Sequence, residues 1–144
     1  MSQIILCVTD HPERFNILRR QAFARNIVLV TSSRLRDVLE YLRGPDTIVG
    51  ITLDFEMPFG TGSMFVKYLH QENISSPIVI TEIDKYGIKK VKESLKEIGF
   101  DNYTVLPYNG IGWEEKAMNF WIIKMVPEVI LLSEFIFNSE PFVE

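Results

Sequence analysis

Short apolar runs alternate with longer amphipathic stretches along most of the chain. The apolar runs are rich in β-branched residues and have the length of buried strands, whereas the longer stretches repeat apolar residues at helical spacing. Strands are predicted at 4–8, 27–30, 48–53, 77–81 and 103–106, and helices at 12–24, 35–42, 63–71, 85–98 and 113–125. Five alternations of strand and helix predict an α/β fold: a doubly wound, five-stranded parallel sheet of (βα)5 type with helices on both faces.

Individual residues mark where the predicted helices begin and end. Pro12 suits the first turn of a helix with Asp10 as a candidate cap, and Thr31–Ser33 offers a cap for the next helix. Gly99 is expected to end the fourth helix, because glycine readily adopts the left-handed conformation that closes a helix. The chain is therefore expected to hold one domain, residues 1–126, followed by an extension.

The extension, residues 127–144, is markedly apolar. Pro127 is expected to end the fifth helix. The apolar residues that follow are Val129, Ile130, Leu131, Leu132, Phe135, Ile136, Phe137, Phe142 and Val143. Such a segment will not remain solvated and has to pack on the domain or on a partner. An extra helix or strand over a sheet edge is one interpretation, and a dimerisation element or docking tail is the other.

Composition excludes several classes of function. The chain has 144 residues, a hydrophobic fraction of 47% and a net charge of −4, which argues against a nucleic-acid-binding surface. It contains a single cysteine, Cys7, in an apolar run, so an intramolecular disulfide is excluded and a reducing compartment is expected. We see neither a signal peptide nor an apolar run of about 18 residues that could span a membrane. These features predict a cytoplasmic protein without a membrane or nucleic-acid partner.

One apolar run stops abruptly at an acid. The predicted strand 48–53 ends at Asp54, at the edge of the sheet where open α/β folds bind their ligands. Asp10 follows the first strand, so the two carboxylates are expected to converge on one pocket. Together with the Glu56 carbonyl they would form a hard-oxygen site of the kind that binds Mg²⁺. The sequence thus predicts a metal site formed by Asp10, Asp54 and Glu56.

The spacing of Asp54, Met57, Pro58 and Gly62 resembles the phosphoacceptor segment of response-regulator receiver domains. The segment 99–108, G-F-D-N-Y-T-V-L-P-Y, resembles the fifth-strand segment of the same family. The resemblance extends over nearly the whole chain and implies a flavodoxin-like, receiver-like fold.

This resemblance also implies roles for three residues. Asp54 corresponds to the phosphorylated aspartate, and Thr81 to the residue whose hydroxyl binds the phosphoryl oxygen. Tyr103 corresponds to the switch aromatic, which turns inward when that threonine moves. The expected site therefore consists of a phosphoacceptor and a switch pair.

Two departures from the family pattern affect the same site. Leu106 occupies the position of the lysine that pairs with the phosphoryl group, and Thr9-Asp10 retains only one acid of the usual pair. Lys85 and Lys89 would replace the missing cation only if the loop after the fourth strand folded back. Because loss of a cation from a desolvated site is costly, efficient phosphorylation is not expected.

Three functions remain open. The first is a stand-alone, atypical receiver-like domain that regulates a protein partner through the face of the fourth helix, fifth strand and fifth helix. The second is a response regulator phosphorylated on Asp54 by a histidine kinase. The third is a metal-dependent enzyme acting on cyclic or other small phosphates. The pattern of Leu53, Asp54, Glu56, Thr61 and Gly62 is similar to receiver-like proteins proposed to process cyclic phosphates, and this resemblance implies that function. A homodimer could form through the apolar extension or through the same face.

Overall fold

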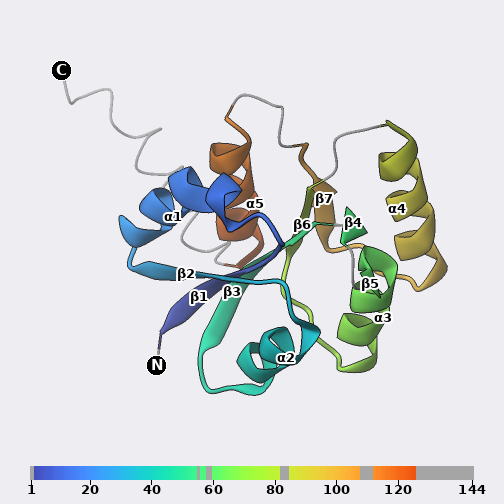
Figure 1. Cartoon of the computed structure of the whole chain (residues 1–144), viewed down its shortest axis with the longest axis horizontal. Coiled ribbons are helices and arrows are strands. Elements are labelled where there is room, and N and C mark those ends of the chain that lie inside the picture. Colours follow the sequence, from blue (N-terminus) through green and yellow to red (C-terminus); the bar gives the residue numbers. More distant parts are fainter. Residues whose placement is uncertain (1, 55, 58–59, 82–84, 108–111, 126–144) are drawn as a thin grey trace, which may run out of the picture.

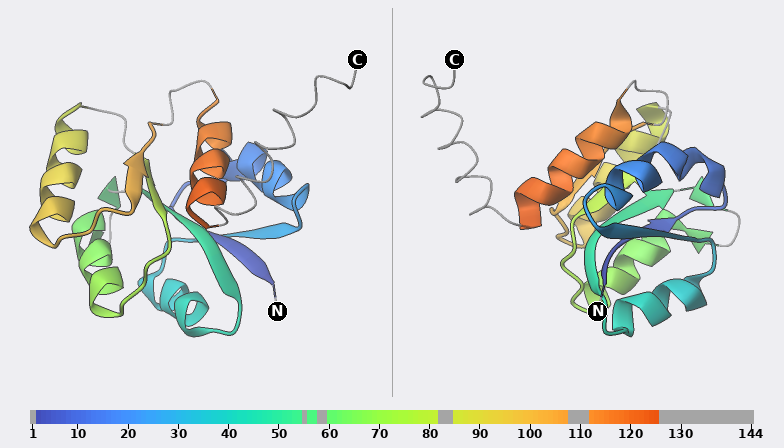
Figure 2. Two further views of the ribbon diagram at one scale, coloured as in Figure 1. Left: turned by 180° about the vertical axis from the view of Figure 1, so that it is seen from behind. Right: turned by 90° about the vertical axis from the view of Figure 1, so that its left-hand side faces the viewer.

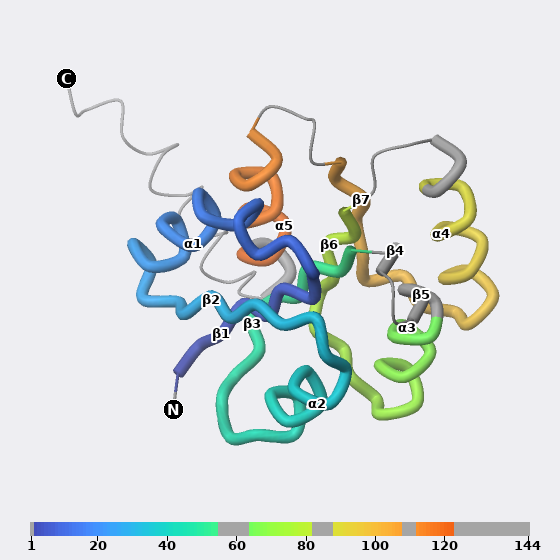
Figure 3. Tube along the Cα trace, in the orientation of Figure 1, coloured from blue at the N-terminus to red at the C-terminus, as the bar shows by residue number. Residues whose placement is uncertain are grey.

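The computed structural model describes residues 2–54, 56–57, 60–81, 85–107 and 112–125 (Figure 1). Five parallel strands form the central sheet in the order β2-β1-β3-β6-β7. They are β1 (Gln3–Val8), β2 (Ile27–Ser32), β3 (Thr47–Asp54), β6 (Ile78–Thr81) and β7 (Tyr103–Val105). The predicted doubly wound sheet is confirmed, and Figure 3 traces the chain as it alternates between strand and helix.

Helices follow the strands and cover both faces of the sheet. They are η1 (Pro12–Phe15, a 3₁₀ helix), α1 (Asn16–Phe23), α2 (Leu35–Arg43), α3 (Gly62–Gln71), α4 (Lys85–Glu97) and α5 (Trp113–Met125). Figure 2 shows α1 and α5 on one face of the sheet and α2 and α3 on the other. None of the helices in the described part of the chain is both long enough and apolar enough to cross a membrane.

Two clusters of buried side chains form the core, one on each face of the sheet. One cluster joins alternate strand residues such as Leu53 and Ile80 to α2, α3 and α4. The other joins residues such as Cys7 and Val79 to η1, α1 and α5. Because successive strand residues point to opposite faces, both clusters draw on the same strands, and the strands read as continuous apolar runs.

Close packing on the face covered by η1, α1 and α5 depends on a glycine in β3. A Cβ atom added at Gly50 would lie 2.5 Å from three atoms of the Trp121 indole ring. The indole of this α5 residue also donates a hydrogen bond from Nε1 to the Pro77 carbonyl, at 3.1 Å. Gly50 therefore allows α5 to lie directly on the backbone of the central strand.

The structure corrects the predicted helix starts. Asp10 does not cap the first helix, since His11 precedes η1 and no side chain caps it. Arg34, beyond Thr31–Ser33, precedes α2 and likewise provides no side-chain cap. Ser32 instead stabilises the turn before α2, because its hydroxyl accepts a hydrogen bond from the Arg34 amide at 3.2 Å. Local turn contacts thus replace the expected caps.

The predicted end of the fourth helix agrees with the structure, whereas a short pair of strands was not predicted. Gly99 ends α4 with a φ of +74°, as expected for a left-handed helix end. A short antiparallel pair, β4 (Glu56–Met57) and β5 (Gly60–Thr61), follows β3 directly. The predicted apolar extension, residues 127–144, lies outside the described residues.

Candidate functional site

The candidate site lies at the carboxyl edge of the sheet, where β1, β3 and β6 end. Asp54 is the last residue of β3 and pairs in register with Thr81, the last residue of β6. Thr9 follows β1 and extends its ladder by donating a backbone hydrogen bond to the Ser32 carbonyl. Strand alternation places Thr9, Asp54 and Thr81 on the face that α1 and α5 cover.

The two threonine hydroxyls hold the Asp54 carboxylate from both sides. Thr9 Oγ1 donates to Asp54 Oδ2 at 2.5 Å, and Thr81 Oγ1 lies 2.6 Å from Asp54 Oδ1. The Thr81 hydroxyl also lies 3.2 Å from the Leu53 carbonyl. The Asp54 carboxylate is the closer acceptor, so the hydroxyl donates its hydrogen bond there. The His11 amide donates to Thr9 Oγ1 at 2.9 Å and so orients the hydroxyl toward Asp54. We call Thr9, Asp54 and Thr81 the hydroxyl clamp.

Burial makes these hydrogen bonds important. Thr9, Asp54 and Thr81 are only 2%, 5% and 4% exposed. A carboxylate removed from water has to be hydrogen-bonded, because leaving it unpaired is costly. The clamp therefore explains how Asp54 can be nearly buried at the end of an apolar strand.

The layer of side chains beneath the clamp is apolar or neutral. Cys7 and Thr52 are paired in register between β1 and β3, two residues along the strands from Thr9 and Asp54. Burial raises the pKa of the Cys7 thiol to about 12, with a smaller opposing effect of the Thr52 hydroxyl and a further increase from the Asp54 charge. Cys7 is therefore a buried neutral thiol and not a nucleophile of the site.

The structure describes the predicted metal ligands only in part. Asp10 is more exposed than Asp54, and its Oδ1 lies 3.4 Å from Nε2 of His11. The side chain of Glu56 lies outside the described residues, although its backbone forms β4 beside the site. In the part of the chain that is described, no three His, Cys, Asp or Glu side chains gather as a metal site. The predicted magnesium site combines two carboxylates with the Glu56 carbonyl, a set that this finding does not cover, so Asp10, Asp54 and Glu56 remain a prediction.

Leu106 is part of the core on the face of the sheet that Asp54 shares. Its amide donates to the Ile80 carbonyl at 2.9 Å, which extends β7 alongside β6 as far as Thr81. Its half-buried side chain packs against the cluster formed by η1, α1 and α5. The position beside Thr81 is thus occupied by an apolar side chain.

Comparison with known proteins identifies the fold. No protein-family model and no curated protein matches the sequence. Among solved structures, the N-terminal signal receiver domain of a two-component response regulator from Bacteroides fragilis is 16% identical, with a TM-score of 0.64. The match covers 84% of this chain and 98% of that one. The chain has the receiver fold.

Two further structures share this receiver fold. The response regulator TrrA from Thermotoga maritima, in complex with Mg²⁺-BeF, is 17% identical, with a TM-score of 0.58 over 83% of this chain and 99% of that one. TrrA has also been solved with the histidine kinase ThkA. An adenylate cyclase from Rhodopirellula baltica is 15% identical, with a TM-score of 0.61 over 90% of this chain and 96% of that one. At these identities the likeness concerns the fold.

The receiver fold places the predicted switch pair on opposite faces of the sheet. Thr81 faces α1 and α5 as part of the clamp. Tyr103 begins β7, is half-buried, and packs against the cluster covered by α2, α3 and α4. Lys89, one of the two lysines considered as replacements for the missing cation, is exposed on α4. The side chain of Lys85 and the loop 82–84 lie outside the described residues.

Sequence reasoning missed Thr9 as a site residue. It counted Thr9 only as the position of a lost acid, whereas the structure makes its hydroxyl a partner of Asp54. The available signal was strand register, because a residue one step beyond β1 lies beside the end of β3. A threonine there takes the place of a second carboxylate and, unlike a carboxylate, donates a hydrogen bond to Asp54.

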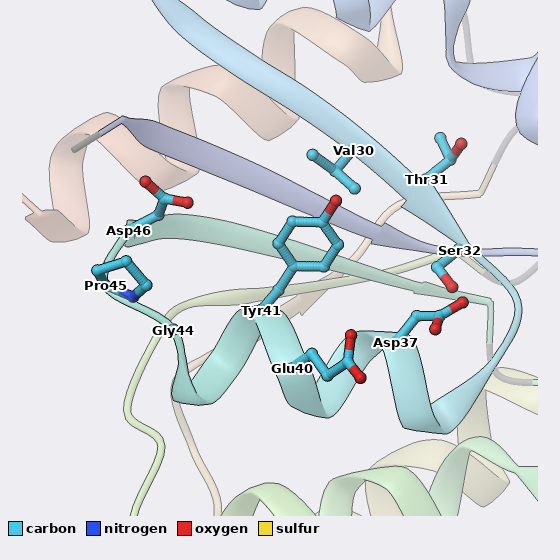
Figure 4. Close-up of a pocket in the computed structure, with 9 residues that line it drawn as sticks. All are labelled: Val30, Thr31, Ser32, Asp37, Glu40, Tyr41, Gly44, Pro45 and Asp46. Atoms are coloured by element: carbon cyan, nitrogen blue, oxygen red, sulfur yellow. The ribbon is translucent and has the colours of Figure 1, made fainter.

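The receiver fold also carries an acidic groove that the sequence analysis did not single out. It has a volume of about 460 Å³ and lies between the edge strand β2 and α2, as Figure 4 shows. Asp37, Glu40 and Asp46 line it together with Tyr41. Asp46 already accepts a hydrogen bond from the Ser2 amide, so this carboxylate is engaged within the chain.

Proposed function

We propose that this protein is an atypical receiver-like signalling domain that acts through protein contact, without efficient phosphorylation of Asp54. The observation that carries the proposal is the hydroxyl clamp, in which Thr9 and Thr81 both hydrogen-bond to the Asp54 carboxylate. In this arrangement the carboxylate is stabilised by neutral donors within the protein.

The chemistry of phosphoryl transfer supports this reading. A phosphoryl group bound at Asp54 would bring additional negative charge into a nearly buried site. Enzymes and receivers that handle such groups offset the charge with cations placed in advance. Leu106 offers no positive charge, and Thr9 offers no second carboxylate for a metal ion. Transfer to Asp54 would also have to displace at least one clamp hydroxyl.

The proposed contact surface is the face formed by α4, β7 and α5. Strand β7 is an edge of the sheet, so one side of its backbone is not paired with another strand of the described sheet. Exposed lysines on α4 (Lys89, Lys90, Lys92 and Lys96) make this face suited to a partner with acidic groups. TrrA, which shares the fold, has been solved with a histidine kinase, and such a kinase or its regulatory target is the kind of partner we propose.

A titration followed by amide NMR tests the state of Asp54. Purified protein is titrated with Mg²⁺ and then with beryllofluoride, an acyl-phosphate mimic, and shifts are followed at Thr9, Asp54, Thr81 and Tyr103. Under the proposal, saturating additions leave the Tyr103 resonance unchanged. Asp54→Asn serves as the control for shifts caused by ions bound elsewhere.

The alternative is a response regulator that is phosphorylated on Asp54. The observation in its favour is that Thr81 already lies 2.6 Å from Asp54 at the carboxyl edge of the sheet. Shifts that begin at Asp54, extend to Tyr103 and disappear in Asp54→Asn would establish this alternative and refute the proposal of a poorly phosphorylated site.

A second experiment tests contact through the proposed face. A photoreactive side chain is placed at Lys92 on α4 in one version of the protein and at Lys67 on α3 in another, both positions being exposed. The proposal predicts a discrete cross-linked partner from Lys92 in cells that contain the protein, and none from Lys67. Equal labelling from both positions would contradict a specific contact through α4. Cross-linking to a second copy would identify a homodimer.

A further inference from the structure

An apolar cavity of about 80 Å³ lies at the amino edge of the sheet, opposite the hydroxyl clamp. Gln3 and Ile27, the first residues of β1 and β2, contribute to its lining. The remaining walls are largely apolar and include Val49 of β3 with Met118, Trp121 and Ile122 of α5. The cavity is therefore a gap in the core cluster shared by η1, α1 and α5.

The character of the cavity favours an apolar occupant over water. Its volume is several times the roughly 10–15 Å³ that a single water needs. A buried water also requires two to four polar partners, and the lining is almost entirely apolar, with Gln3 as its polar member. Apolar side chains would fill this space and restore the packing density of a protein interior.

The chain itself continues from the wall of this cavity. Ile122 lines it, and α5 ends only three residues later, at Met125. Residues 126–144 come next and carry the apolar series from Val129 to Phe137. An extended residue spans about 3.3–3.6 Å, so the first residues after Met125 can reach the cavity without a long loop.

We propose that residues 126–144 dock on their own domain and insert apolar side chains into this cavity. Attachment to the end of α5 gives the segment a high effective concentration at the cavity, which a free partner would have to exceed. The exposed Phe23, at the end of α1 and four residues before Ile27, provides further apolar surface for the segment to cover. This inference is independent of the proposed signalling role and leaves the face of α4 and β7 free for a partner.

Cross-linking within the full-length chain tests the placement of the segment. Cysteines are introduced as Gln3→Cys at the cavity and, one at a time, as Ile130→Cys, Leu131→Cys and Leu132→Cys, in a Cys7→Ala background. A short bismaleimide is expected to join at least one pair within a single chain. The matched control is Lys89→Cys on α4, combined with the same three positions, which is expected not to react within the chain.

Fluorescence of Trp121 provides an independent measurement. Trp113→Phe leaves Trp121 as the only tryptophan, and Leu131→Asp with Leu132→Asp makes the segment polar in the full-length chain. Undocking is expected to shift Trp121 emission to longer wavelength and to raise its quenching by acrylamide at least twofold. Glu134→Gln, which leaves the apolar residues intact, is expected to change neither quantity.

Two results would overturn the inference. Cross-linking from Gln3 no stronger than from Lys89, with unchanged Trp121 emission in the polar variant, would show that the segment does not occupy the cavity. Cross-links that join two chains and increase with protein concentration would show that a second copy provides the occupant. Neither result bears on the response of Asp54 to beryllofluoride, so failure of this inference is distinguishable from failure of the proposed function.

Discussion

Replacing Thr9 by valine tests whether the hydroxyl clamp stabilises the fold. Valine keeps the shape of threonine but removes the hydroxyl that donates to Asp54 Oδ2 at 2.5 Å. A hydrogen bond to a charged group contributes about 1.5–3 kcal/mol, and here the carboxylate that loses its donor is nearly buried. We expect Thr9→Val to lower the free energy of unfolding by about 2 kcal/mol, within that range.

Urea unfolding followed by circular dichroism measures this loss. For a slope of about 2 kcal/mol/M, the expected change lowers the midpoint by about 1 M urea. Thr9→Ser retains the hydroxyl and should recover most of the stability. Thr104→Val, at a half-buried threonine of β7, is the control for replacing a strand threonine by valine. A loss in Thr9→Val no greater than in Thr104→Val would refute the energetic role of the clamp.

Thr9→Asp tests whether the threonine at position 9 limits metal binding beside Asp54. A second carboxylate in place of the hydroxyl would lie within hydrogen-bond distance of Asp54, where two negative charges repel each other. We expect this variant to be destabilised in EDTA and to regain stability with Mg²⁺, by about 2.7 kcal/mol at a hundredfold excess over the dissociation constant. The response of the natural chain should be smaller. Equal responses would mean that Thr9 does not limit metal binding.

Three further predictions concern the core and the surface. Gly50→Ala should lower the free energy of unfolding by about 1–3 kcal/mol, because its Cβ would lie 2.5 Å from the Trp121 indole; an unchanged urea midpoint would contradict this. Cys7 should resist thiol reagents in the folded protein, and stability should fall as pH rises from 9.0 toward about 12, because only the unfolded thiol then ionises. That fall should vanish in Cys7→Ala, and its persistence there would assign it to another group. The pKa of Glu72 is lowered by hydrogen bonds from Tyr68 and Arg43, so this carboxylate stabilises the fold above its ordinary pKa of 4.5 and loses that effect as pH falls through its lower folded value. Arg43→Ala should therefore flatten the acid limb of a thermal-unfolding profile, and an unchanged limb would refute this role.

Most of the fold could be predicted from sequence because its signals are local. The β-branched apolar runs indicated strands, and Gly99 ended a helix with a φ of +74° as glycine does. The pair β4 and β5 escaped prediction because each strand has two residues, too few for a periodic pattern. The helix caps were misplaced because Asp10 and the residues Thr31–Ser33 are of the types that cap helices, whereas the residues that precede the two helices are His11 and Arg34.

The site was harder to predict because its geometry comes from register between strands distant in sequence. Asp54 and Thr81 were identified by the family resemblance, and the structure brings their side chains within 2.6 Å. The convergence of Asp10 with Asp54 was inferred from adjacent strands alone. Strand register also brings the hydroxyl of Thr9, the residue before Asp10, into contact with Asp54, whereas the convergence of Asp10 remains a prediction.

The two departures from the family pattern are physically consistent with each other. A buried pair of charged carboxylates is stabilised by a metal ion or a cationic side chain, because like charges in a desolvated site raise each other's energy. With Leu106 in the place of the lysine, the side chain at position 106 gives a second acid next to Asp54 no compensating charge. Threonine at position 9 removes the second charge and supplies a hydrogen-bond donor to the first. A single carboxylate that accepts hydrogen bonds from two hydroxyls needs less compensating charge than a pair of carboxylates, so Thr9 and Leu106 are consistent with the function proposed above.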